Sequence, residues 1–185
     1  MEKRALAVDL RGRTALVTGA SSGIGAAVAE ALAANGAFVW VNYPDEATAE
    51  AAEAVVTLIT VAGGKAKSVQ ADVSHEADVL EMFSQLASGP LDILVNNAGI
   101  AHSSPIEALE VDDFDRLIDV HLRGTFLCTR SAMRMMYVQN SGRIINTASQ
   151  LAYIGAPGFS HYTAAKGAIL SFTRSLALEI GERPI

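Results

Sequence analysis

The sequence predicts an α/β fold: a doubly wound, Rossmann-like parallel sheet in three α/β/α layers, built by residues 1–185 as a single domain. Short apolar, β-branched segments alternate with longer segments rich in Ala, Leu and Glu. This alternation is typical of βαβ units, whose parallel strands are covered on both faces. The length of 185 residues, with 50% hydrophobic and 18% charged residues, suits one globular domain with a sizeable core.

Five apolar segments have the length and composition of buried strands. They occupy residues 14–20, 37–43, 66–73, 91–99 and 143–149. The first helix is predicted over residues 24–34 and is followed by Asn35-Gly36, a typical C-terminal stop. The apolar stripe of this helix consists of Ile24, Val28, Ala31 and Leu32.

Composition excludes several classes of function. A net charge of −6 without a long run of Lys or Arg argues against a nucleic-acid partner. The N-terminal residues MEKRALAVDLRGR lack the apolar stretch of a secretory signal, and no segment reaches the length of a membrane span. The one cysteine, Cys128, excludes an internal disulfide, and the histidines lack the spacing of a metal site. We therefore expect a cytoplasmic protein without a metal.

A glycine-rich turn joins the first strand to the first helix. Gly19, Gly23 and Gly25 have the spacing G-x-x-x-G-x-G, which differs from the usual G-x-G-x-x-G of dinucleotide-binding turns. Glycines here allow a tight turn and a close approach of the backbone to a pyrophosphate at the helix N-terminus. Ser21 and Ser22 offer hydroxyl groups as helix caps or phosphate contacts. The alternative is a plain turn that needs positive φ.

The segment T-G-x-x-x-G-x-G resembles the glycine motif of the classical short-chain dehydrogenase/reductase family. Residues 95–99, VNNAG, match the family's N-N-A-G motif, and residues 71–73, ADV, match the Asp-Val after its third strand. Ser149 precedes Tyr162 by 13 residues and Lys166 follows one helical turn later, as the family's catalytic Ser, Tyr and Lys do. The resemblance covers nearly the whole chain and implies a dinucleotide-binding Rossmann-like domain.

The resemblance also implies which residues bind the cofactor. They are Gly19, Ser21, Ser22, Gly23, Ile24, Gly25, Tyr43, Asp72, Val73, Asn96, Ala98, Gly99, Tyr162 and Lys166. Within this set, Asp72 would accept a hydrogen bond from the adenine amino group, and the N-N-A-G motif would lie beside the adenosine half. Lys166 would hold the hydroxyls of the nicotinamide ribose.

The choice between NAD and NADP depends on the side chains that meet the adenosine ribose after the second strand. No Lys or Arg occurs within residues 14–64 to pair with a 2′-phosphate. Asp45 and Glu46 follow the strand closely, and a carboxylate there would accept a hydrogen bond from a free 2′-hydroxyl and repel a phosphate. NAD is therefore favoured over NADP. Three observations keep NADP open: Tyr43 stands where NAD-preferring relatives usually carry Asp, the acidic pair also suits a helix start, and Arg13 is a candidate phosphate partner.

Tyr162 and Lys166 lie one turn apart on the same face of a predicted helix. A nearby ammonium stabilises the phenolate form that acid/base catalysis on an alcohol or ketone oxygen requires, and Ser149 can hydrogen-bond the same oxygen. By resemblance, Tyr162 takes the alcohol proton as hydride leaves for the nicotinamide, or returns it during reduction. We therefore predict an NAD(P)-dependent alcohol dehydrogenase or carbonyl reductase. The alternative is a surface Tyr and Lys with a Ser at a strand end.

His121 stands where the family usually carries Asn, in the phrase DVHLRG. By resemblance, that Asn helps to hold a water chain leading to the lysine, and an imidazole nitrogen can serve similarly. His121 is therefore a fourth catalytic candidate. A buried structural histidine is the alternative, because the same helical stripe contains Phe114, Leu117, Ile118, Leu122 and Phe126.

The segments expected to line the substrate site, residues 100–105 and 150–159, carry no charge. They favour a neutral, partly apolar alcohol or ketone, and steroids, sugars and acyl thioesters all stay open. Residues 41–55 are loosely similar to glucose dehydrogenase-like members of the family, and 3-oxoacyl thioester reductase-like members are also similar.

The sequence ends at GERPI, where relatives continue with a sixth and a seventh strand. We therefore expect a domain that is C-terminally incomplete relative to the family. A non-catalytic dinucleotide-binding protein, acting as a sensor or assembly partner, is the alternative function. A homo-oligomer, dimer or tetramer, is expected through helices 124–138 and 161–179. In the first of these, three methionines supply either adaptable apolar surface or core packing: Met133, Met135 and Met136.

Overall fold

Five parallel strands form one sheet, in the order β3-β2-β1-β4-β5, in the computed structural model, which describes residues 8–185. The strands are β1 (Thr14–Val17), β2 (Phe38–Tyr43), β3 (Lys65–Gln70), β4 (Ile93–Asn96) and β5 (Arg143–Asn146). Each overlaps one predicted segment, so the doubly wound parallel sheet is confirmed. The prediction that the N-terminus lacks a secretory signal falls partly on residues 1–7, outside the described residues.

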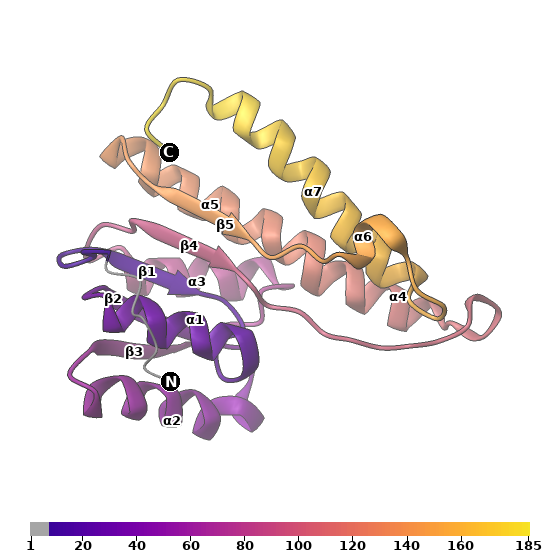
Figure 1. Ribbon diagram of the computed structural model, residues 1–185, viewed down its shortest axis with the longest axis horizontal. Coiled ribbons are helices and arrows are strands. Elements are labelled where there is room, and N and C mark those ends of the chain that lie inside the picture. Colours follow the sequence, from indigo (N-terminus) through magenta and orange to yellow (C-terminus); the bar gives the residue numbers. More distant parts are fainter. Residues whose placement is uncertain (1–7) are drawn as a thin grey trace.

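Helices cover both faces of this sheet (Figure 1). They are α1 (Gly23–Ala34), α2 (Ala49–Val61), α3 (Glu76–Leu86), α4 (Val111–Ile118), α5 (Gly124–Gln139), α6 (Leu151–Ile154) and α7 (Ser160–Ile180), with short 3₁₀ turns η1 (Glu46–Thr48) and η2 (Ile106–Ala108) and a π-helix η3 (Asp119–Arg123). Helices α1 and α2 pack together, α3 packs against α5, and α7 packs against α4 and η3. Within residues 8–185, no helix is both long and apolar enough to cross a membrane.

The central strands are apolar on both faces, because successive side chains of a strand point to opposite sides. Val17 and Val95 belong to a buried cluster with side chains of α1 and α2. Their neighbours Leu16 and Leu94 belong to a second cluster with side chains of α3 and α5. This two-sided burial explains why the strands read as continuous apolar segments in the sequence.

Helix α1 buries only part of the predicted stripe: Val28 and Leu32 are partly buried against the core, whereas Ala31 is exposed. Ala26, Ala29 and Ala33 are buried, whereas Ile24 is 70% exposed. The small alanine side chains let the helix approach the sheet closely, and Ile24 lies in the first turn, where the helix end faces a cavity. The core-facing side of the helix therefore includes the predicted Val28 and Leu32 beside these alanines, but not Ile24.

The π-helix η3 interrupts the regular spacing between α4 and α5. Leu117 and His121 are buried, but Phe114 and Phe126 are 40% and 42% exposed. A π turn holds an extra residue and rotates everything after it. The predicted common stripe therefore holds for Leu117, Ile118, His121 and Leu122, which are buried or partly buried. It fails at Phe126, which follows the π turn, and at Phe114, which precedes it near the exposed start of α4.

The methionines of α5 pack in the core. Met136 is fully buried, Met133 is nearly so, and Met135 packs against the same cluster. The core-packing alternative therefore holds for Met135 and Met136, while Met133, although buried, lines a groove between α5 and α7.

Candidate functional site

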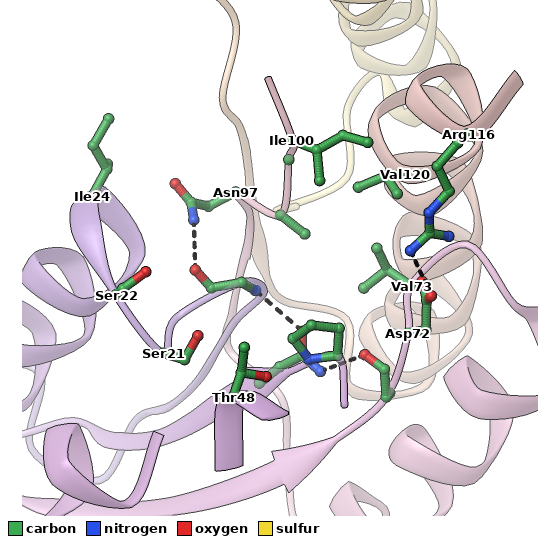
Figure 2. A pocket seen from close by; sticks show the side chains of 16 residues that line it. Ser21, Ser22, Ile24, Thr48, Asp72, Val73, Asn97, Ile100, Arg116 and Val120 are labelled. Atoms are coloured by element: carbon green, nitrogen blue, oxygen red, sulfur yellow. Dashed lines mark hydrogen bonds and ion pairs between the residues drawn. The ribbon is translucent and has the colours of Figure 1, made fainter. Parts of the chain in front are cut away.

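The candidate site lies at the carboxyl ends of the strands, where the strand order reverses between β1 and β4. Ligands of doubly wound sheets bind in the crevice at this point. A cavity of about 340 Å³ opens here (Figure 2). Its lining residues follow four strands and include part of α4 and η3: Gly19, Ser21, Ser22, Ile24, Asn42, Pro44, Thr48, Ala71, Asp72, Val73, Asn97, Ala98, Gly99, Ile100, Arg116 and Val120.

Polar side chains lock the loops around this cavity to one another. The Thr18 hydroxyl accepts hydrogen bonds from the backbone N–H groups of Asn97 and Ala98, both at 3.0 Å. The Asn97 amide donates to the carbonyls of Thr18 and Gly19, at 3.0 and 3.1 Å. Asn42 accepts from the Gly19 N–H at 3.1 Å and donates to Ala71 O at 3.0 Å. The cavity wall is therefore held in place before any ligand binds.

Gly19 brings the first loop against the loop after β4. Its φ is +59°, and a Cβ added there would lie 2.7 Å from Ala98 Cα. Gly25, in the first turn of α1, has no room for a Cβ either, because it would lie 2.3 Å from Gly19 O. Both glycines are needed for close packing of the turn.

The N-terminus of α1 meets the cavity without a side-chain cap. Ser22 occupies the N-cap position, yet its hydroxyl makes no capping hydrogen bond, and the first turn contains no acidic residue. The N–H groups of a first helical turn lack intrahelical partners and carry a positive partial charge. This helix end is suited to hold an anion.

Eight of the predicted cofactor residues line the cavity: Gly19, Ser21, Ser22, Ile24, Asp72, Val73, Ala98 and Gly99. Six others do not line it: Gly23, Gly25, Tyr43, Asn96, Tyr162 and Lys166. Asn96 lies beneath it, where its amide donates to Thr129 Oγ1 at 2.9 Å and to Asn146 Oδ1 at 2.8 Å. Asn96 thus ties β4 to β5 and α5.

The acidic pair after β2 is also absent from the lining. Asp45 caps η1, because its carboxylate accepts from the Thr48 backbone N–H at 3.2 Å and from the Thr48 hydroxyl at 3.0 Å. Glu46 is an exposed residue in the first turn of η1. The pair therefore acts at a helix start, and Thr48 is the residue of this turn that reaches the cavity.

Several residues at the cavity were not predicted from the sequence: Thr18, Asn42, Thr48, Asn97 and Arg116. Asn97 belongs to the VNNAG motif, and Thr18 directly precedes the first glycine of the turn. Both could therefore have been predicted as site residues from the sequence motifs. No motif in the sequence pointed to Arg116, because it lies in α4 and contacts Asp72 across 44 positions of sequence.

The first two turns of α7 carry Tyr162 and Lys166 on one side of the helix. Lys166 Nζ lies 5.8 Å from the centroid of the Tyr162 ring and donates to Thr147 O at 2.7 Å. Lys166 is buried, and burial lowers its pKa to about 8. Ser149, two residues after Thr147, accepts from the Leu151 N–H at 3.2 Å. The Ser149 segment therefore runs beside α7.

His121 connects the cavity to Tyr162. Its ring meets the Tyr162 ring edge-on, with centroids 5.5 Å apart, and Nε2 lies 2.8 Å from the backbone O of cavity-lining Ile100. Within residues 8–185, the buried Nδ1 atom has no hydrogen-bond partner. Burial, together with the nearby Lys166 and His161, lowers the pKa of His121 to about 4, despite its hydrogen bond to Ile100. The imidazole is neutral at physiological pH.

Comparison with known proteins agrees with this geometry. The family model described as short chain dehydrogenase matches residues 13–185. A 3-oxoacyl-[acyl-carrier-protein] reductase of Synechocystis sp. is 43% identical over 183 residues, covering 95% of this chain and 71% of that protein. Versicolorin reductase of Emericella nidulans is 43% identical over 179 residues, covering 95% of this chain and 66% of that protein.

Solved structures are similar over the same extent. A dehydrogenase/reductase from Sinorhizobium meliloti has a TM-score of 0.89 at 43% identity and covers 97% of this chain and 71% of its own. A short chain dehydrogenase from Burkholderia cenocepacia, in complex with NADP, has a TM-score of 0.88 at 40% identity and covers 96% and 72%. Because the family model spans the sheet and its helices from β1 to α7, this chain belongs to the short-chain dehydrogenase family of oxidoreductases.

Proposed function

We propose that this protein is an NAD(P)-dependent oxidoreductase that interconverts a neutral ketone and the corresponding alcohol, with Tyr162 as general acid/base. One observation carries the proposal. The cavity at the strand ends and the Tyr162–Lys166 pair are joined through His121, which contacts Ile100 on one side and the Tyr162 ring on the other. A dinucleotide in the cavity is thereby brought next to a proton-transfer group.

The residues present fit such a dinucleotide. The uncapped N-terminus of α1 suits the pyrophosphate, and the absence of a side chain at Gly19 lets the turn lie close to Ala98. Asp72 and Val73 line the opposite end of the cavity, where the adenine base would lie. When bound, the cofactor supplies or accepts the hydride.

Tyr162 would exchange the proton. In reduction, its hydroxyl donates a proton to the carbonyl oxygen as that oxygen gains negative charge; in oxidation, the phenolate accepts the proton of the alcohol. The Lys166 ammonium, 5.8 Å from the ring centroid, stabilises the phenolate. Ser149 positions the reacting oxygen by a hydrogen bond, and neutral His121 offers Nδ1 as a further hydrogen-bonding atom beside the tyrosine.

The substrate side is uncharged and partly apolar. Phe159 packs edge-on against Tyr162, with ring centroids 6.1 Å apart, and the loop at Ser104 is tied to Gly158 O by a 3.0 Å hydrogen bond. These surfaces suit a neutral ketone. Relatives named as 3-oxoacyl-[acyl-carrier-protein] reductase act on such a group, so a 3-oxoacyl thioester is the first substrate to test.

The cofactor is NAD or NADP. The acidic pair that favoured NAD is absent from the cavity lining, which includes Ser21, Ser22 and Thr48. The Burkholderia cenocepacia relative was solved with NADP. Thermal shifts with each dinucleotide decide the choice, because clearly tighter NADP binding would leave the charge argument for NAD without support.

The experiment follows nicotinamide absorbance with a panel of ketones and secondary alcohols, 3-oxoacyl thioesters included. Wild-type protein is expected to turn over at least one of them, and Tyr162→Phe to lose about 10²-fold or more of that rate because the proton donor is gone. Tyr162→Phe should still bind the cofactor. Binding of the dinucleotide by the wild type without turnover of any panel member would contradict the proposed enzyme and favour a binding protein.

We also propose that the protein works in the cytoplasm as a homo-oligomer built through α5 and α7. A groove of about 300 Å³ between these helices combines apolar side chains with the polar and charged side chains of Thr129, Arg130, Arg134 and Glu179. Its apolar side chains are Phe126, Met133, Tyr137, Phe172 and Leu176. A second copy of the chain is the proposed occupant.

A further inference from the structure

Asp72 and Arg116 meet at one end of the cavity, opposite Ser21 and Ser22 (Figure 2), and Ser74 completes a ring of hydrogen bonds with them. Arg116 donates through Nη2 to Asp72 Oδ2 at 2.9 Å and through Nη1 to Ser74 Oγ at 2.6 Å. The Ser74 hydroxyl and backbone N–H both donate to Asp72 Oδ1, at 2.7 and 2.9 Å. The ring joins the loop after β3 to α4.

The ring leaves the carboxylate one open position. An ionised carboxylate accepts at about four lone-pair sites and donates at none. Ser74 takes both sites of Oδ1, and Arg116 takes one site of Oδ2. One acceptor site therefore remains on Oδ2, and Asp72 is one of the residues that line the cavity.

The ring also keeps this carboxylate charged. Burial raises the pKa of Asp72, but the hydrogen bonds from Ser74 and the Arg116 guanidinium more than offset burial and hold that pKa below its usual range. The other titratable groups nearby are His75, whose Nδ1 lies 3.8 Å from Asp72 Oδ2, and Asp78, which accepts from the Asp72 N–H at 3.2 Å. At neutral pH, the cavity therefore presents a pure acceptor at this point.

We propose that Arg116 is a positioning residue that orients the Asp72 carboxylate so that the cavity selects dinucleotides with a 6-aminopurine base. The inference rests on the proposed dinucleotide function and adds the means of base selection. An adenine amino group donates into the open Oδ2 site. In hypoxanthine, a carbonyl oxygen replaces this amino group. That oxygen is an acceptor and is repelled by the carboxylate, so neither the carbonyl oxygen nor Asp72 Oδ2 gains a hydrogen bond from the other.

Arginine is required for this task because its planar fork holds two acceptors in fixed geometry, whereas a lysine ammonium is a point charge on a flexible stem. Arg116 bridges an oxygen of Asp72 and an oxygen of Ser74 with two different nitrogens. Loss of the fork frees the Asp72 carboxylate to turn, so the open site no longer has a defined direction.

The test measures dissociation constants by isothermal titration calorimetry for the better bound of NAD and NADP and for its hypoxanthine analogue. The wild type is expected to bind the adenine form about tenfold or more tightly. Arg116→Met should reduce that ratio at least threefold, and Arg116→Lys should reduce it as well. Arg123→Met is the matched control: it removes an equally exposed arginine, paired with Asp119 on the neighbouring turn and outside the cavity lining.

Each outcome has a defined meaning. Equal affinity of the wild type for both bases, or an unchanged ratio in Arg116→Met, would overturn the proposal. A proportional loss of both affinities would also overturn it, because Arg116 would then bind the cofactor directly. If Arg116→Met fails to fold, Ser74→Ala tests the same ring. Failure of the wild type to bind any dinucleotide would instead contradict the proposed function.

Discussion

His121 shows how burial decides the chemistry of one side chain. The imidazole is 2% exposed, and its protonated form would lie beside the Lys166 ammonium. Desolvation and the nearby positive charge both favour the neutral ring. His121 therefore differs from a typical histidine switch, which changes charge between pH 5 and 8, and it supplies a constant hydrogen-bonding group beside Tyr162.

This state has a consequence for acid stability. The pKa of His121 falls from 6.5 to about 4 on folding, so the unfolded chain binds the proton more readily in this window. The contribution of His121 to the free energy of unfolding is therefore fully present above pH 6.5. It is lost as the pH falls toward 4, by on the order of 1–3 kcal/mol. His121→Asn should remove this part of the pH dependence in denaturant titrations at pH 4 to 7.

The half-exposed His102 provides the control, because His102→Asn also removes one imidazole. His102→Asn keeps the buried His121, so the loss of stability between pH 6.5 and 4 that His121 causes should remain in this variant. Parallel stability curves for His121→Asn and the wild type would show that the buried imidazole does not govern acid stability.

At the scale of elements, the turn between β1 and α1 combines two kinds of glycine. Gly19 and Gly23 have nearly the same φ, +59° and +58°. A Cβ on Gly19 would lie 2.7 Å from the backbone of Ala98, whereas a Cβ on Gly23 meets nothing within 4 Å. The two positions separate backbone strain from steric conflict between loops.

Gly19→Ala and Gly23→Ala therefore form a matched pair. Gly23→Ala should cost about 1–2 kcal/mol of unfolding free energy, from the left-handed conformation alone. Gly19→Ala should cost more and also weaken dinucleotide binding, because the loop after β4 must move away. Thermal unfolding and calorimetric binding measure both effects. Equal losses in the two variants would mean that the contact with Ala98 has no part in shaping the cavity.

For the whole molecule, the groove between α5 and α7 connects the fold to assembly. The groove is lined by aromatic and aliphatic side chains, with charged side chains among them, on two helices that each contribute buried residues. Exposed apolar surface rimmed by polar residues marks protein interfaces. Leu176 lines the groove, and Leu178, on the same helix, is 83% exposed outside it.

Sedimentation velocity is expected to show a dimer or tetramer for the wild type. Leu176→Glu should shift it toward monomer, because a carboxylate would be desolvated in the interface. Leu178→Glu adds the same charge outside the groove and should leave the assembly intact. A monomeric wild type, or equal effects of the two variants, would argue against an interface at this groove.

The strands, the glycine turn and the spacing of Ser149, Tyr162 and Lys166 could all be predicted from the sequence. These features depend on local physics: apolar segments form buried strands, glycine permits the turn, and residues four apart share a helix face. The tertiary structure alone decided the contacts between distant elements. In the folded chain, Arg116 donates a hydrogen bond to Asp72, and Asp45 caps the short helix η1. His121 is buried within the π-helix η3. Such contacts depend on how elements pack in three dimensions, and no periodicity or spacing along the chain encodes them.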